Sequence, residues 1–287
     1  MATKAPVLLA PAMNVNMWEN PIYQRNQADL EQLGYHFVQP AEGFLACGWE
    51  GKGKLADPGE IFEETIGLTL PNDLTGETVL VTAGPTREEI DPVRYISNYS
   101  SGKMGYAIAR AARLRGAKVV LVSGPSALPQ PVGVERICVT SAAEMKEAVL
   151  DRCDEASIIV KAAAVADYRP AHRAEHKMKK HHTDALNLEL EKNPDILSEL
   201  GRRKGHRILV GFAAETRDLL ENARKKLTEK NLDLIVANDI TQQHAGFDVD
   251  TNVVRLLAPD GSEEILPEMA KDEVAHRLLD RILALRG

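Results

Sequence analysis

The sequence predicts an α/β protein built on a doubly wound, mostly parallel sheet. The first observation is that short apolar runs, rich in valine and isoleucine, alternate with helical stretches through residues 77–287, which is typical of repeated β–α units. The second is that these runs are apolar throughout, so helices should cover both faces of the sheet. The strands are expected at residues 79–82, 118–122, 134–139, 157–165, 207–212 and 232–237.

Capping and turn residues place helices and a hairpin around this sheet. Ser141 and Glu144 have the spacing of a capping box, which predicts a helix start. Pro259-Asp260-Gly261 separates two apolar runs and predicts a hairpin. The resulting expectation is helices at residues 142–153, 219–230 and 268–285, and hairpin strands at 253–257 and 263–266.

A separate block precedes the repeated units. Leu70-Pro71-Asn72-Asp73-Leu74-Thr75-Gly76 has the composition of a linker or turn, which divides the chain into domains of residues 1–70 and 71–287. In the first block the pattern predicts strands at 6–10 and 36–38, helices at 21–33 and from about 58, and a glycine-rich loop at 43–54.

Composition excludes several classes of function. Of the 287 residues, 44% are hydrophobic and 27% charged, as in ordinary globular proteins. The formal net charge of −7 argues against nucleic acid or an anionic membrane as a partner. No run reaches the ~18 apolar residues of a membrane helix, and no signal peptide is recognisable. Three widely spaced cysteines indicate reduced thiols, so a cytoplasmic location is expected.

The connection after the first strand of the second domain is the most informative segment. It is long and polar, and ends in Ser100-Ser101-Gly102-Lys103-Met104-Gly105 before an alanine-rich helix. Small residues at a helix start let backbone N–H groups approach an anion, which predicts a phosphate or nucleotide site. The glycines also suit a plain tight turn and close helix–strand packing. The spacing matches neither G-x-G-x-x-G nor a P-loop.

Further segments follow later strands. Asp167 comes after the small residues of Ala163-Ala164-Val165-Ala166, where a metal or ribose ligand is expected, or else a capping aspartate. Pro194 and Asp195 mark a helix start, which attracts phosphate but is also a common cap. Phe212 could stack on a base or belong to the core. Lys226 and Lys230 share a helix face, which suits a triphosphate or a helix C-terminus.

Residues 171–189 interrupt the β–α pattern with histidines and lysines. His172 and His176 could share a helix face and bind a metal, although no carboxylate or thiol completes a set. With His181, His182 and Lys177 the segment also suits a flap that closes over an anionic ligand, or a solvated loop.

These motifs resemble those of the bacterial bifunctional coenzyme A biosynthesis proteins, in which a phosphopantothenoylcysteine decarboxylase is fused to a phosphopantothenate–cysteine ligase. The ligase resemblance covers residues 71–287 and implies a Rossmann-like domain. It is carried by TAGPTREEIDPVRYISNYSSGKMG, AAAVADYRP, KMKK, KNPDIL, GFAAET and the Lys226–Asp233 segment followed by ANDI.

The resemblance implies a two-step ligation. The carboxylate of 4′-phosphopantothenate attacks the α-phosphate of CTP, giving an acyl-cytidylate and pyrophosphate, and the amine of cysteine then displaces CMP. Mg²⁺ and cationic side chains would spread the phosphoryl charge. The choice of CTP over ATP comes from the resemblance alone, as does the expectation of a homodimer formed through the ligase domain, with the hairpin and the 171–189 insertion as contact surfaces.

The same resemblance assigns residues. Asn98 and Lys177 would be catalytic, with Asn98 hydrogen-bonding the acyl group of phosphopantothenate or its cytidylate and Lys177 holding the nucleotide from the flap. Asp167 and Asp195 are the candidate Mg²⁺ ligands. The nucleotide would contact Ala162, Ala163, Ala164, Asp167, Lys177, Asn193, Pro194, Asp195, Ile196, Phe212, Lys226 and Lys230. The acyl substrate would contact Gly84, Asn98, Ser101, Gly102, Met104 and Gly105.

Residues 1–70 resemble the last part of a flavodoxin-like, FMN-dependent decarboxylase. Asn14 would hold the substrate carboxylate, and Cys47 would be the proton donor. Lys54 stands where the family has arginine and cannot give its planar, bidentate fork. The flavin phosphate site and the catalytic histidine are missing, so the sequence predicts a decarboxylase half cut at its N-terminus, exposed apolar surface, and no FMN binding or decarboxylation by this chain alone.

Two functions of other classes remain as alternatives. One is a nucleotide-binding module without catalysis, and the other is an oxidoreductase or methyltransferase on a similar sheet. The absent glycine fingerprint weighs against the oxidoreductase.

Overall fold

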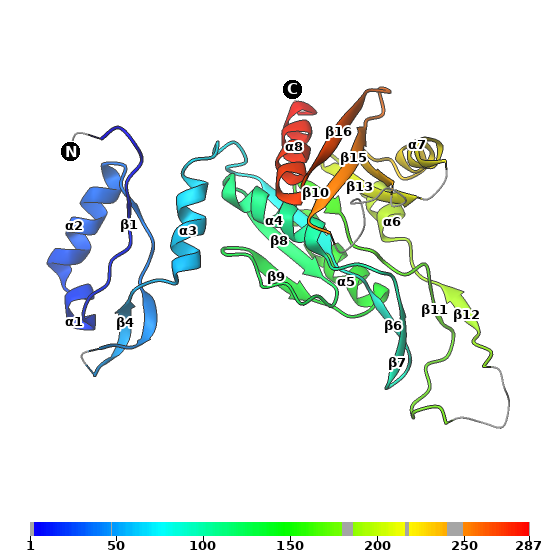
Figure 1. Ribbon diagram of the computed structural model, residues 1–287, viewed down its shortest axis with the longest axis horizontal. Coiled ribbons are helices and arrows are strands. Elements are labelled where there is room, and N and C mark those ends of the chain that lie inside the picture. The colour runs from blue at the N-terminus through cyan, green and yellow to red at the C-terminus, as the bar shows by residue number, and fades with distance from the viewer. Residues whose placement is uncertain (1–2, 47, 180–185, 216–217, 240–248, 287) are drawn as a thin grey trace. The chain divides into compact units, whose positions relative to one another are not determined.

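The computed structural model describes residues 3–46, 48–179, 186–215, 218–239 and 249–286 (Figure 1). The chain divides into two compact units, residues 1–73 and 74–287.

The second unit is built on an eight-stranded sheet with the order β16-β15-β14-β13-β10-β5-β8-β9. Six neighbouring strands, from β14 to β9, pair in parallel. The last two strands in sequence pair antiparallel, β15 with β14 and β16 with β15. The strands are β5 (Thr78–Ala83), β8 (Lys118–Ser123), β9 (Glu135–Cys138), β10 (Ile158–Lys161), β13 (Ile208–Glu215), β14 (Leu234–Asp239), β15 (Thr251–Leu257) and β16 (Glu263–Ala270).

The order of the parallel strands fixes where a ligand can bind. Counted along the chain, the parallel strands lie in the order 3-2-1-4-5-6, and the direction of winding reverses between β5 and β10. In doubly wound sheets, ligands bind beyond the carboxyl ends of the strands at such a reversal.

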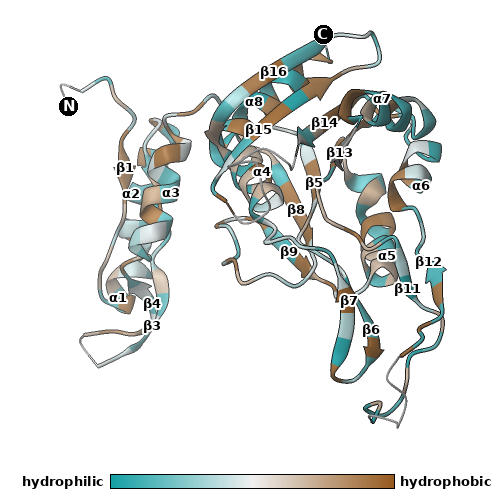
Figure 2. Cartoon of the chain, turned by 45° about the vertical axis from the view of Figure 1, so that its right-hand side comes forward, coloured by the Kyte–Doolittle hydropathy of each residue, from teal (hydrophilic) through white to brown (hydrophobic). Residues whose placement is uncertain are grey.

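Helices cover both faces of this sheet, as the apolar strands predict. Helices α4 (Lys103–Leu114) and α8 (Lys271–Ala284) pack on the face that carries Val79 and Val81. Helices α5 (Ala142–Arg152), α6 (Ile196–Arg202) and α7 (Leu219–Glu229) pack on the face that carries Leu80. Figure 2 shows the hydrophobic strands between these helices.

Two small antiparallel hairpins extend from the parallel sheet, and the sequence pattern missed both (Figure 1). The connection after β5 contains β6 (Arg87–Asp91) and β7 (Arg94–Ser97), and the insertion lies between β11 (Tyr168–Pro170) and β12 (Leu190–Lys192). Their charged residues give none of the apolar runs by which the other strands were predicted.

Several boundaries differ from the prediction. The strand expected at 157–165 ends at Lys161, because the chain after it follows the loop from β5. Helix α5 is capped by Ser141 as predicted, but it ends at Arg152, and Cys153–Glu155 form a 3₁₀ turn after it. Strand β16 continues through Pro267, which an edge strand tolerates, and so α8 starts later than expected.

The first unit contains only short strands. Leu8–Leu9 (β1) pairs in parallel with His36–Phe37 (β2), and the predicted glycine-rich loop is instead a hairpin of Ala41–Phe44 (β3) and Glu50–Lys54 (β4). Its helices are α1 (Val15–Trp18), α2 (Pro21–Gln32) and α3 (Pro58–Gly67). The expected exposure of apolar side chains is confirmed, with Met17, Ile22, Leu33, Phe44, Trp49, Leu55 and Phe62 all exposed.

Across the described ranges, none of the helices combines the length and the apolar character that a membrane crossing requires.

Candidate active site

The chains leaving β5 and β10 continue side by side beyond the sheet. Two buried hydroxyl groups fix them together. Thr82 Oγ1 accepts a hydrogen bond from the N–H of Ala163 at 3.1 Å, and Thr86 Oγ1 accepts one from Ala166 at 3.0 Å. The alanine-rich segment 162–166 therefore forms a rigid floor at the point where the winding reverses.

A cavity of about 410 Å³ lies at this floor, a volume within the range of small-molecule sites. The predicted residues that line it are Asn98, Gly102, Met104, Gly105, Ala162, Ala163, Ala164 and Phe212. Lining side chains that the sequence argument missed include Tyr99, Lys103, Lys161, Asn238, Asn252 and Lys271. The lining set of the described chain does not contain Gly84, Ser101, Asp167, Lys177, Asn193, Pro194, Asp195, Ile196, Lys226 or Lys230.

Glycines at the start of α4 serve close packing. Gly102 caps α4 with a φ of +84°, and Gly84 turns the chain after β5 with a φ of +74°. A Cβ on Gly105 would lie 2.5 Å from the Cβ of Ala83, so α4 approaches β5 closely only because this residue is glycine. Gly105 therefore serves close helix–strand packing, one of the two roles expected for these glycines. Gly102 and Gly105 also line the cavity.

Asn98 links the β6–β7 hairpin to the cavity floor. It directly follows β7, and its Nδ2 donates to the carbonyl oxygen of Val165 at 3.0 Å. The hydroxyl of Ser97 holds the neighbouring chain by donating to the carbonyl of Thr86 at 2.7 Å. Asn98 is therefore fixed at the edge of the cavity.

Lys161 is the last residue of β10 and lines the cavity. It pairs with Thr82 of β5 and Gly211 of β13, and strand alternation places its side chain on the face covered by α6 and α7. Its Nζ donates to the carbonyl oxygen of Ala163 at 3.2 Å.

Charged side chains from three segments surround Lys161. Burial, followed by the ammonium of Lys230, lowers the pKa of Lys161 to about 8; Asp195 and Asp167 oppose this effect, and Lys226 adds to it. The structure thus brings four predicted residues, from α6, α7 and the loop after β10, close enough to Lys161 to affect its charge.

Asp195 has two partners in this cluster. As the N-cap of α6 its Oδ1 accepts from the N–H of Ser198 at 3.0 Å, and its Oδ2 lies 3.0 Å from Nζ of Lys230. Burial alone would raise the pKa of Asp195, but these two partners outweigh it and hold that pKa below its ordinary value. The predicted helix start is confirmed.

Asn193 carries a buried acceptor oxygen in its side-chain amide. Its Nδ2 donates to the carbonyl of Ala166 at 2.9 Å, which orients the amide. Its Oδ1 is buried and has no hydrogen-bond partner among the described residues. A buried acceptor of this kind indicates a missing donor, such as a ligand hydroxyl or amino group.

The segment that carries Lys177 is attached to the β6–β7 hairpin through the backbone of its neighbour Met178. The carboxylate of Asp91, fully buried at the turn of the β6–β7 hairpin, accepts the N–H of Met178 at 3.1 Å, and Arg94 donates to the carbonyl of Met178 at 3.2 Å. The expected convergence of Lys177, Lys226 and Asp195 on one cavity is therefore not met: Lys226 and Asp195 lie near Lys161, whereas the Lys177 segment follows the hairpin.

Other predicted site residues lie outside this cavity. Asn14, in the first unit, caps α1 by accepting from Asn16 at 2.8 Å. Cys47, His181 and His182 lie outside the described residues. His172 and His176 stand on irregular chain rather than on a helix, and the described residues contain no group of three or more His, Cys, Asp or Glu side chains placed to hold a metal.

A second cavity, of about 490 Å³, lies between the amino end of β14 and the β15–β16 turn. Its Lys204 is already paired with Asp233 at 2.7 Å. Because ligands of doubly wound sheets bind at the carboxyl ends of the strands, the switch-point cavity is the better candidate despite its smaller volume.

Comparison with known proteins shows the family to which the chain belongs. Residues 74–285 match the family model described as the DNA/pantothenate metabolism flavoprotein C-terminal domain, and residues 1–70 match the model described as Flavoprotein. The coenzyme A biosynthesis bifunctional protein CoaBC of Bacillus subtilis is 51% identical over 99% of this chain and 71% of its own length. The chain belongs to the CoaBC family. CoaBC of Escherichia coli is 46% identical over 99% of the chain and 70% of its own length.

Solved structures agree with the fold of the second unit. The crystal structure of the C-terminal domain of a CoaBC protein has a TM-score of 0.64 at 47% identity and covers 74% of this chain and 98% of its own. The DNA/pantothenate metabolism flavoprotein of Streptococcus pneumoniae has a TM-score of 0.63 at 29% identity, covering 73% and 99%. Membership of the CoaBC family makes the chain part of a multifunctional coenzyme A biosynthesis family with ligase, decarboxylase and flavoprotein character.

Proposed function

We propose that the second unit is a phosphopantothenate–cysteine ligase that consumes CTP. The observation that carries the proposal is the cavity at the winding reversal, with its alanine floor and adjacent lysines, in a chain of the CoaBC family. In the first step the carboxylate oxygen of 4′-phosphopantothenate bonds to the α-phosphorus of CTP and pyrophosphate leaves. In the second, the cysteine amine bonds to the acyl carbon, loses a proton, and CMP leaves.

The floor suits a nucleotide. Small side chains at Ala163 and Ala164 allow a flat ligand to lie against the backbone, and half-buried Phe212 offers a ring for base stacking. The buried Oδ1 of Asn193 would accept a hydrogen bond from the nucleotide. Lys226 and Lys230, on the face of Lys161, would hold the phosphates.

The acyl substrate would lie on the α4 side of the cavity. Asn98 is fixed at this edge by its bond to Val165, so its amide is held in place before substrate arrives. Preorganised donors of this kind stabilise a developing oxyanion because they need no reorientation during the reaction. Gly84, Ser101, Gly102, Met104 and Gly105 would shape this side.

The carboxylates fit Mg²⁺ brought in by the nucleotide. Mg²⁺ is commonly held by one or two carboxylates together with substrate phosphates, so a complete protein cage is not needed. Asp167 and Asp195 would supply these carboxylates, and the ion would neutralise charge on the phosphates.

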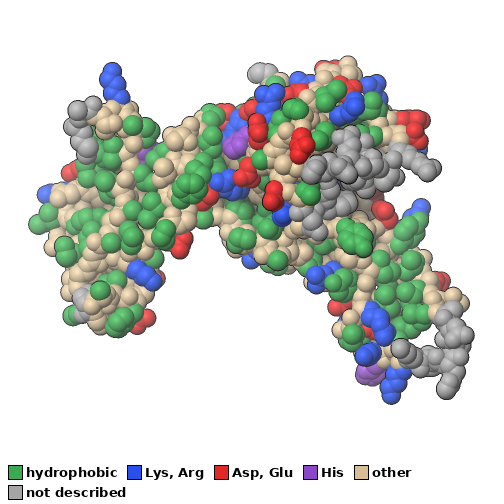
Figure 3. Space-filling view, in the orientation of Figure 1, with side chains coloured by type: hydrophobic (Ala, Val, Ile, Leu, Met, Phe, Trp, Pro, Cys, Tyr) green, Lys and Arg blue, Asp and Glu red, His purple; other side chains and the backbone are tan. Residues whose placement is uncertain are grey.

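The predicted contact surfaces are the β15–β16 hairpin, on which Ile265 is exposed, and the insertion between β11 and β12. We add the β6–β7 hairpin, so that a second copy of the chain would also cover the two small hairpins. Val93, Tyr95, Tyr168 and Leu190 are large apolar side chains exposed on them, and Figure 3 shows hydrophobic side chains on this surface. Exposed apolar side chains, where they gather on one surface, often mark a protein interface. The proposed assembly is a homodimer through the second unit.

For the first unit, the proposal is the flavin-dependent decarboxylase part of the family, with Asn14 as substrate ligand and Cys47 as proton donor. The match of residues 1–70 to the Flavoprotein model supports it, and FMN is the flavin we expect the family to use.

Pyrophosphate release tests the ligase proposal. The purified chain is expected to release pyrophosphate only when CTP, 4′-phosphopantothenate and Mg²⁺ are all present, and to release CMP only when cysteine is added. Binding of CTP without pyrophosphate release would favour the non-catalytic nucleotide-binding module instead.

A further inference from the structure

Lys161 is a charged side chain in a position that packing alone would fill with an apolar one. The residues before it in β10 are Ile158, Ile159 and Val160, all buried. Lys161 ends this central strand, lines the cavity, and has the carbonyl oxygen of Ala163 as a hydrogen-bond partner at 3.2 Å.

The charges facing Lys161 do not neutralise it. They come from Asp195 at the start of α6, Lys226 and Lys230 on α7, and Asp167 in the loop after β10. Asp195 is already engaged by Lys230 at 3.0 Å. Among the described charges that act on Lys161, the two lysines lower its pKa and the two aspartates raise it, and the lowering prevails together with burial beside the cavity.

An arrangement of this kind costs stability unless an anion joins it. Burial first, and the neighbouring ammonium of Lys230 second, disfavour the charged state of Lys161, which is why its pKa is lowered. Groups held in such unfavourable states cluster at functional sites, because a ligand supplies the missing opposite charge.

We propose that Lys161 is a nucleotide-positioning residue whose ammonium binds a phosphoryl oxygen of the triphosphate, between the alanine floor and the lysines of α7. The inference rests on the proposed function, to which it adds a residue that the family motifs did not point to. A phosphate is favoured over the carboxylate of the acyl substrate because Lys161 faces α6 and α7, whereas Asn98 and the α4 start lie on the other side of the cavity.

The experiment compares Lys161→Met with Lys161→Arg. Methionine keeps the length of the side chain and removes the charge, and arginine keeps the charge. The measurement is pyrophosphate release at varied CTP and at varied 4′-phosphopantothenate. Lys161→Met is expected to raise the KM for CTP about 10- to 100-fold, the usual range for a hydrogen bond to a charged group, with a smaller effect on the KM for 4′-phosphopantothenate. Lys161→Arg is expected to restore most of the CTP affinity.

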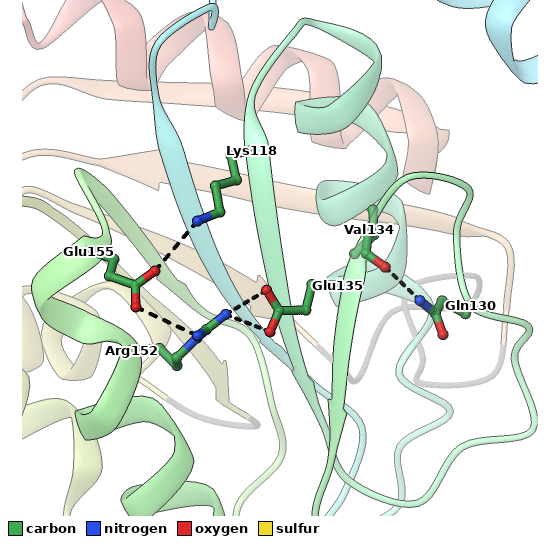
Figure 4. Close-up of polar contacts among 6 residues, drawn as sticks. All are labelled: Lys118, Gln130, Val134, Glu135, Arg152 and Glu155. Carbon is green, nitrogen blue, oxygen red and sulfur yellow. Dashed lines mark hydrogen bonds and ion pairs between the residues drawn. The ribbon is translucent and has the colours of Figure 1, made fainter. Parts of the chain in front are cut away.

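Lys118→Met is the matched control. Lys118 begins β8 at the opposite end of the sheet, where its Nζ lies 3.5 Å from Glu155 in an ion-pair network with Arg152 and Glu135 (Figure 4). Removing this surface ammonium lowers the charge of the protein equally and is expected to leave both KM values unchanged.

Three outcomes decide the matter. An unchanged KM for CTP in a folded Lys161→Met protein would overturn the inference, and so would a rise confined to 4′-phosphopantothenate. If the wild-type protein releases no pyrophosphate, the proposed function fails, and calorimetric titration with CTP then tests Lys161 by itself: weaker binding to Lys161→Met than to Lys118→Met supports the inference, and equal binding overturns it.

Discussion

Replacing Lys161 should stabilise the second unit even as it weakens the site. The pKa of Lys161 falls from 10.5 to about 8 in the folded chain, which corresponds to about 3 kcal/mol of unfavourable free energy for the charged form. Because part of the side chain remains accessible to water, this value is an upper bound. Lys161→Met is therefore expected to raise the free energy of unfolding at pH 7 by about 1–3 kcal/mol.

The pH dependence of the stability gain distinguishes the charge of Lys161 from better packing as its cause. A lysine with a lowered pKa destabilises the folded state fully below about pH 8, where it is protonated in both states, and the effect fades as the pH rises toward 10.5, where both states are neutral. The gain from Lys161→Met should thus shrink across that window. Better packing by methionine would instead give a gain that does not change with pH.

Urea unfolding followed by circular dichroism measures this gain. Both tryptophans, Trp18 and Trp49, lie in the first unit, so tryptophan fluorescence reports that unit separately and should be unchanged in the variant. Lys118→Met serves again as the control. Equal or lower stability of Lys161→Met at pH 7 would refute the electrostatic reasoning.

Further predictions concern other parts of the protein. Asn98→Asp replaces the amide that donates to the carbonyl of Val165 with a carboxylate, so turnover of the acyl substrate should fall more than the affinity for CTP. Equal losses of both in kinetic assays would show that Asn98 does not act on the acyl group. Lys177→Gln should slow pyrophosphate formation by at most ~2.7–4 kcal/mol of barrier, and unchanged kinetics would count against the flap. Gly105→Ala should destabilise the second unit by about 1–3 kcal/mol in urea, because its Cβ meets Ala83; no loss would show that α4 can shift freely. The purified chain should lack a flavin absorbance spectrum, since β1 and β2 form only a two-stranded parallel sheet among the described residues; a yellow protein would contradict this.

The sequence predicts the parallel sheet well because each central strand is buried on both faces. Runs such as Val79–Val81 must be apolar throughout, and they alternate with helices, so the fold class follows directly. The β6–β7 hairpin is not predicted, because its strand Arg87–Asp91 is charged and its pairing depends on contacts with distant parts of the chain, such as Met178 with Asp91.

Sequence motifs identify the floor of the site but not its charge distribution. Small residues after a buried strand point to Ala162–Ala164, which do line the cavity. Lys161 is missed because the strand is predicted to continue to residue 165, so the lysine is taken to lie within the strand and not at its end. The signal that could have identified it is a single lysine at the end of an apolar run. The location of the segment that carries Lys177 follows from the contact of Met178 with Asp91, a buried aspartate 87 positions earlier, which no local pattern contains.

A crystal structure of the protein with CTP and Mg²⁺ tests the central claim most directly. The account predicts the nucleotide against residues 162–166, with its phosphates toward Lys161 and the lysines of α7. A nucleotide bound at the amino ends of the strands, or on the other side of the sheet from α6 and α7, would contradict it.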